Sequence, residues 1–180
     1  MILAVVTLPF DIMNLARLEK FCGSALKVSV LVVVMGGCGQ QEDKPKAVHV
    51  TCINNLKQIG LAVSLWAVDN NLMEPWNVST NNGGTLELCE VDKDGFDTNA
   101  ALHFQVMSNE LNTPLILICP KDQSRKPAAD FQSLRPANVS YRLRSGTNSS
   151  RANPREILAV CPVDGNVLYC DGTVKEVKEH

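Results

Sequence analysis

The chain has 180 residues, of which 45% are apolar and 20% are charged, and its net charge at neutral pH is −2. This composition is ordinary for a globular protein and does not suggest an intrinsically disordered chain. The charge balance, without a cluster of lysine and arginine and without a row of aromatic residues, argues against nucleic-acid binding. The length fits one domain with an extension.

Residues 1–37 are predicted to be a signal peptide or membrane anchor. The apolar run 28–35 is shorter than the roughly 20 residues that span a bilayer, so it fits a signal peptide better than a permanent membrane helix. Residues 1–12 form a second apolar run, interrupted by Pro9 and Asp11. A start at Met13 gives a more regular signal peptide than a start at Met1. The basic residues before the apolar run are Arg17, Lys20 and Lys27.

The sequence Val-Met-Gly-Gly-Cys at 34–38 resembles the lipobox of bacterial lipoproteins. The resemblance implies cleavage before Cys38 and lipidation of its thiol, which would anchor the protein to a membrane. The alternative is an ordinary cysteine behind an uncleaved anchor. Residues 38–49 then form the lipidated cysteine and a polar tether. Gly39 after the cysteine favours the outer membrane within the cell envelope.

The globular domain is expected to span 50–180 and to begin with an amphipathic helix at 51–71. Its apolar residues recur every three or four positions, and Thr51 is a candidate N-cap. Asn55 falls on the predicted polar face, and an Asp-Asn-Asn sequence stops the helix. The predicted buried face contains Ile53, Leu56, Gly60, Val63 and Ala67, widened by Leu61, Leu65 and Val68.

Short elements follow this helix. A second helix is expected at 99–111, where apolar residues again have helical spacing. Alternating or continuous apolar runs predict strands, and Asp-Gly pairs predict the last two turns. One helix followed by an antiparallel meander is an α+β fold, in which the sheet packs against the helix. The predicted strands are 85–91, 115–119, 139–143, 156–161, 167–169 and 173–177.

Several blocks resemble bacterial pilin-like proteins related to type II secretion pseudopilins, a group abundant in planctomycetes and verrucomicrobia. The most specific block is Cys-Ile-Asn-Asn-Leu-Lys-Gln-Ile-Gly-Leu-Ala at 52–62, and weaker blocks lie at 117–120, 138–141 and 167–174. The resemblance implies a pilin-like fold. The prepilin motif Gly-Phe-Thr-Leu-x-Glu is absent from the sequence, and the lipobox-like segment stands in its place. The fold is therefore expected to carry over more than the filament role.

Cysteine is abundant, and exported thiols tend to oxidise. A disulfide is predicted among Cys119, Cys161 and Cys170, and its pairing is open. One option is Cys161 with Cys170, which flank a hairpin turn and could face each other. The alternative is that several cysteines are small buried apolar residues. Zinc fits poorly, since there is no Cys-x-x-Cys and the histidines are isolated. Catalysis by a Cys–His pair has no support from sequence neighbours.

The acidic turn at 92–97 is the candidate metal site. Asp92, Asp94 and Asp97 surround Gly95 and offer oxygen ligands that calcium prefers, although an EF-hand glutamate is missing. A solvated turn is the simpler interpretation, and no other cofactor is expected.

The sequence predicts a non-enzymatic envelope lipoprotein with a structural or adaptor role. Its partners would be proteins of a type II secretion or pilus-like assembly. The alternative is a lipoprotein that binds a small ligand or calcium. An enzyme ranks last, because no catalytic constellation is visible in the sequence.

Overall fold

The computed structural model describes residues 44–146 and 149–176. The expected signal segment at 1–37 and the lipidation site Cys38 lie outside these residues. Within the described part of the chain, no helix combines the length and apolarity needed to cross a membrane.

The first helix, α1 (Lys44–Asp69), begins well before the expected position. Thr51 lies inside it, and its hydroxyl donates to the carbonyl of Ala47 at 2.9 Å instead of capping the helix. The predicted N-cap is therefore wrong, and part of the expected tether is helical. The predicted stop is confirmed, since the chain turns after α1 with Asn71 and Leu72 at φ values of 58° and 63°.

The predicted buried face of α1 is confirmed at Leu56, Gly60, Val63 and Ala67, but its predicted flank is wrong. Leu61, Leu65 and Val68 were expected to widen the buried face, but they are 58%, 46% and 59% exposed. The spacing of apolar residues predicts which side of a helix faces the core, but not how wide a surface the rest of the fold covers. The polar Asn55 is buried, and its Nδ2 donates to the carbonyl of Ile118 at 3.1 Å. The residues that do form the buried face include Cys52, Leu56, Ile59, Ala62, Val63 and Trp66.

The C-terminal part of the chain is a four-stranded antiparallel sheet. The strands pair in chain order, so the predicted meander and the α+β class are confirmed. Gly165 and Gly172 have φ values of 70° and 83°, as the Asp-Gly turns require. The strands are β1 (Arg142–Leu143), β2 (Ile157–Val160), β3 (Asn166–Tyr169) and β4 (Val174–Glu176).

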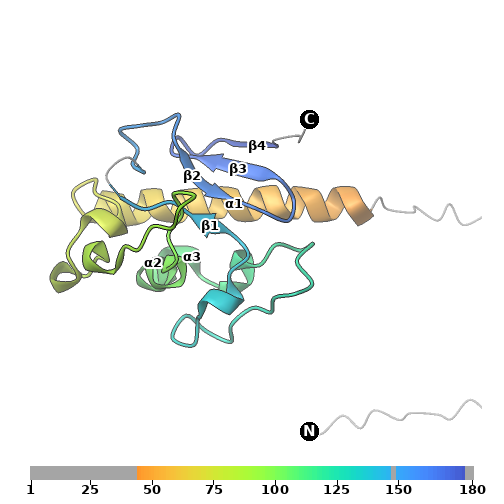
Figure 1. Ribbon diagram of the computed structural model, residues 1–180, viewed down its shortest axis with the longest axis horizontal. Helices are drawn as coiled ribbons and strands as arrows, with labels where there is room; N and C mark the ends of the chain where they lie inside the picture. Colours follow the sequence, from red (N-terminus) through yellow and green to blue (C-terminus); the bar gives the residue numbers. More distant parts are fainter. Residues whose placement is uncertain (1–43, 147–148, 177–180) are drawn as a thin grey trace, which may run out of the picture. The chain divides into compact units, whose positions relative to one another are not determined.

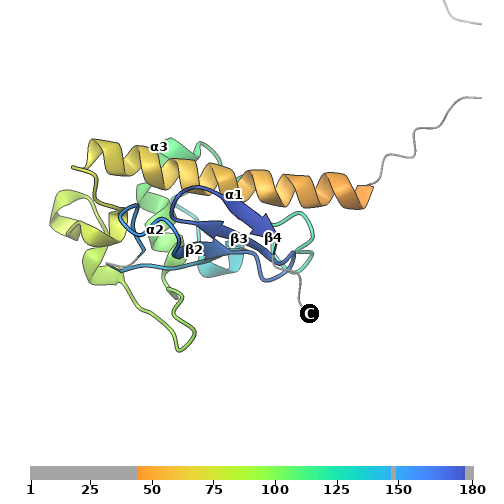
Figure 2. The same ribbon diagram turned by 90° about the horizontal axis from the view of Figure 1, so that it is seen from above.

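The sheet packs against α1, which runs as a long rod beside the strands in both views (Figures 1 and 2). A Cβ atom on Gly60 would lie 3.1 Å from Leu168 Cδ1, closer than ordinary contact. The missing side chain lets the helix approach β3. Leu168 is fully buried beneath it.

Two short helices, α2 (Ala100–Val106) and α3 (Ser108–Leu111), replace the single helix expected at 99–111. Their breakpoint is Met107, which is fully buried and has non-helical backbone angles. The predicted helical content is confirmed, and α3 also packs against α1.

Two predicted strands are wrong. Residues 85–91 contain the 3₁₀ turn η3 (Leu86–Leu88), and 115–119 contain η4 (Pro114–Leu117). Thr113 caps η4, because its hydroxyl accepts from the backbone N–H of Leu115 at 3.3 Å. Neither run joins the four-stranded sheet, and a strand without a neighbour leaves its backbone groups unpaired. The remaining 3₁₀ turns are η1 (Pro75–Asn77), η2 (Thr80–Asn82) and η5 (Pro136–Asn138).

Candidate functional site

Three cysteines from distant parts of the chain converge in the core. Cys52 lies on α1, Cys119 follows η4, and Cys161 follows β2. Their sulfur atoms all lie within 4.8 Å of one another, and all three residues are at most 1% exposed. We call these three residues the thiol cluster. It joins the helix, the central loops and the sheet at one point.

Hydrogen-bond donors surround the thiol cluster. The hydroxyl of Tyr141 donates to Cys52 Sγ at 3.8 Å, and the backbone N–H of Asp164 donates to Cys161 Sγ at 3.3 Å. Both donors favour negative charge on sulfur. The side chain of Asn166 also interacts with the Cys52 thiol.

The three thiols differ in acidity. A hydrogen bond from Cys161 lowers the pKa of Cys52 to about 6, although burial opposes this shift. The same contact with Cys52 and burial raise the pKa of Cys161, and burial raises the pKa of Cys119. The pKa of Cys52 is therefore the lowest of the three, and the thiols titrate as one interacting group.

An acidic side chain lies beside the cluster. The Asp164 carboxylate is almost fully buried and contacts Lys121 Nζ, while its Oδ2 lies 3.0 Å from His49 Nδ1. Asn166 Nδ2 donates to the same Oδ2 at 3.1 Å. Burial would raise the pKa of Asp164, but Lys121 and His49 outweigh it and lower the pKa. The thiol cluster is therefore adjacent to a small polar network formed by Asp164, Lys121 and His49.

The predicted disulfide needs one correction. Ile157 pairs with Tyr169 and Val160 with Val167, so Cys161 and Cys170 lie at opposite ends of the β2–β3 hairpin. Their separation is about five strand residues, roughly 16 Å, whereas a disulfide needs Cα atoms within about 7 Å. The expected pair across the hairpin is wrong.

Cys119 and Cys161 do come together, and all five described cysteines are thiols in the structure. A disulfide between these two stays a prediction. Sequence reasoning missed Cys52 as the third member. Its place on the apolar side of an amphipathic helix was the available signal.

The predicted calcium ligands are divided between two environments. Asp92 Oδ2 and Asp94 Oδ2 lie 2.7 and 3.2 Å from the same guanidinium nitrogen of Arg142, which places a cation between them. Asp97 is buried and forms part of a separate polar group. The three carboxylates do not converge on one point, and calcium binding stays a prediction.

That separate polar group is centred on His103, which is fully buried. Its Nδ1 lies 2.7 Å from Thr85 Oγ1, and its Nε2 lies 2.9 Å from Asp97 Oδ2. Cys89 Sγ lies within 4.8 Å of ligand atoms of His103 and Asp97. Trp76 covers the imidazole edge-on, with ring centroids 5.8 Å apart. No sequence pattern indicates this convergence, because the residues come from separate elements.

The His103 group has the residue types of a cysteine nucleophile with a base, but its arrangement favours a structural role. Both ring nitrogens already face polar partners, Thr85 and Asp97. Burial raises the pKa of the Cys89 thiol, and the carboxylates of Asp97 and Glu87 add to this shift. A nucleophilic thiol requires the opposite shift.

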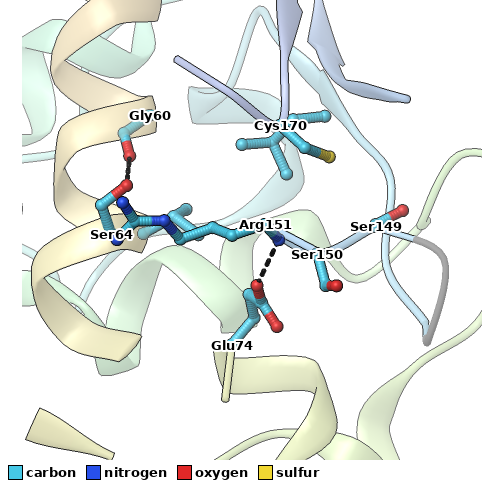
Figure 3. A pocket seen from close by; sticks show the side chains of 9 residues that line it. Gly60, Ser64, Glu74, Ser149, Ser150, Arg151 and Cys170 are labelled. Atoms are coloured by element: carbon cyan, nitrogen blue, oxygen red, sulfur yellow. Dashed lines mark hydrogen bonds between the residues drawn. The ribbon is translucent and has the colours of Figure 1, made fainter. Parts of the chain in front are cut away.

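A small pocket lies between α1 and the loop that follows β1. Figure 3 shows the side chain of Arg151 extending toward Ser64, while the backbone N–H of Arg151 donates to Glu74 Oε1 at 2.9 Å. The buried Glu74 also accepts from Asn77 Nδ2 at 3.0 Å. The pocket encloses about 10 Å³, about the space that one water molecule needs. Its geometry is that of a buried carboxylate holding a loop.

No protein-family model, curated protein or solved structure matches this chain.

Proposed function

We propose that this protein is a non-enzymatic lipoprotein of the bacterial cell envelope. Its pilin-like domain would act as a structural or adaptor component of a type II secretion or pilus-like assembly. The lipobox-like end at Cys38 supports the anchor, and the order of helix and antiparallel meander fits the pilin-like resemblance.

The observation that carries the proposal is an uncovered apolar stripe on α1. Leu61, Leu65 and Val68 are spaced by four and three residues, so they lie on one side of the helix. Each is 46–59% exposed. Covering such a side chain fully contributes about 1.5–3 kcal/mol to the free energy of association. We call these residues the outer stripe, and we propose a second pilin-like helix as its partner, because exposed apolar rows on two helices can pack together.

The alternative role is the binding of a small ligand or calcium. For calcium the support is weaker, because Arg142 already neutralises Asp92 and Asp94.

Site-specific photo-crosslinking in the native host tests the proposal. A photoreactive amino acid replaces Val68 in the full-length chain, and crosslinked proteins are identified by mass spectrometry. We expect pilin-like or secretion-assembly proteins. The double substitution Leu61→Lys and Leu65→Lys should remove these products with little change in stability, since both side chains are exposed.

The matched control is Leu115→Lys, which changes an equally exposed leucine outside the outer stripe. It should leave the crosslinks intact. Crosslinking that is unaffected by the stripe double variant, or that yields no secretion or pilin-like protein, would contradict the proposed role.

A further inference from the structure

We propose that Cys52, Cys119 and Cys161 bind one copper(I) ion through their three sulfur atoms. This inference stands independently of the proposed envelope role. It replaces the Cys119–Cys161 disulfide as the interpretation of the thiol cluster.

The spacing of the sulfur atoms suits a shared metal ion. Three sulfur ligands at about 2.3 Å around one ion lie about 4 Å apart. The three sulfurs are already within 4.8 Å of one another, so closing around an ion requires shifts below about 1 Å. A disulfide would bring one pair to about 2.05 Å and leave the third thiol unused. The metal uses all three.

The number and type of ligands select the ion. The group of metal-binding side chains that includes these cysteines contains three residues in the described part of the chain, and no histidine or carboxylate joins it. All three cysteines are buried, which leaves little access for water. Zinc almost always takes four ligands in such structural sites. Thiolates favour the soft copper(I) ion, which accepts a low coordination number.

The surroundings stabilise charge on sulfur before any metal binds. Tyr141 and the backbone N–H of Asp164 donate to two of the sulfurs. Each thiol that binds the metal as a thiolate releases its proton to solvent.

Metal binding should also cross-link the fold. The three ligands come from α1, the loop after η4 and the end of β2, so one ion would connect elements that are otherwise held by packing. A ligand that binds only the native state raises the melting temperature. For a domain of this size, a saturating ion should raise Tm by about 5–10 °C.

The experiment titrates copper(I) into the reduced, full-length protein in detergent, without oxygen and against a competing copper(I) chelator. We expect one equivalent of copper beyond that bound by the serine variants Cys52→Ser, Cys119→Ser and Cys161→Ser. Cys170→Ser is the matched control, because Cys170 is also buried but lies outside the thiol cluster. It should bind as much copper as the unaltered protein and show the same rise in Tm.

X-ray absorption of the copper-loaded, unaltered protein does not depend on the folding of any variant. Its expected result is three sulfur neighbours at about 2.3 Å. Two outcomes would overturn the proposal. One is tighter binding of zinc(II) than of copper(I) with the same dependence on the three cysteines. The other is a disulfide within the cluster in protein that is alkylated in the native host and isolated without reductant.

Discussion

Asp97 illustrates how a residue chosen from sequence for one role has another in the fold. Its carboxylate accepts hydrogen bonds from the backbone N–H groups of Asn99 at 2.7 Å and Glu90 at 3.2 Å. Ser145 donates to it through its hydroxyl, and His103 contacts it. Burial would raise the pKa of Asp97, but these donors together lower it. The carboxylate therefore stabilises the fold in its charged form.

Asp97→Asn should reduce the free energy of unfolding by about 2 kcal/mol at pH 7, because it removes a buried charged acceptor. A carboxyl whose folded pKa is lowered stabilises the protein above its unfolded pKa of about 3.9. That contribution is lost as the pH falls through the folded value. Urea unfolding at pH 7 and pH 3 should show the difference between the two proteins shrinking at the lower pH.

Asp94→Asn is the control, since it removes an equal charge from an exposed carboxylate of the same turn. We expect a change below about 1 kcal/mol at both pH values. An Asp97→Asn penalty that stays constant between pH 7 and pH 3 would assign the loss to packing instead of charge.

At the scale of elements, the loop of η1, η2 and η3 depends on a close backbone approach at Gly84. A Cβ atom there would lie 2.1 Å from the carbonyl oxygen of Val78, which is a backbone atom and cannot turn aside. Gly84→Ala should therefore cost more than about 2 kcal/mol, as measured by thermal or urea unfolding.

The neighbouring Gly83 provides the comparison. It has a φ of 84°, and a Cβ atom added there would have no atom within 4 Å. Gly83→Ala should therefore cost only the left-handed backbone term of about 1 kcal/mol. A loss for Gly84→Ala no larger than that for Gly83→Ala would contradict a tight backbone contact between Gly84 and Val78.

The elements differed in how well the sequence predicted them. The strands β2 and β3 were anticipated, because alternating apolar residues and Asp-Gly turns act locally. The runs at 85–91 and 115–119 were not, because a strand exists only where another strand pairs with it. The predicted burial of the second run is nevertheless correct at Ile116 and Leu117, which lie in the core although the segment is a 3₁₀ turn.

The candidate site was less predictable than the fold. Cys52, Cys119 and Cys161 meet only after α1, the central loops and the sheet have packed together, so no local pattern contains them. The same holds for Thr85, His103 and Cys89. Spacing in the sequence identifies ligands that lie on the same helix, strand or loop, and the members of each of these groups lie on different ones.

At the scale of the whole molecule, the proposed lipid anchor makes a direct prediction. The mature protein isolated from membranes of its native host should have the mass of residues 38–180 plus a lipid, because we propose that the chain is cleaved and lipidated at Cys38. Intact-mass measurement of the detergent extract checks this. Cys38→Ser should instead leave the full-length, unlipidated chain. If the wild-type protein has the mass of the full-length, unlipidated chain, then residues 1–37 are an uncleaved anchor and the lipobox prediction is wrong.

The packing of α1 sets an order on how the fold can be completed. Two of its neighbours, α3 and η4, are available once the chain has been made to residue 117. Another neighbour, β3, ends at residue 169, so Gly60 meets Leu168 only after the chain has been made to that point. Until then α1 carries a bare apolar side, which makes the nascent chain a substrate for holding chaperones. The same delay leaves the hydrophobic core incomplete until β3 and β4 have been made, so the chain stays unfolded enough to pass through a translocation channel.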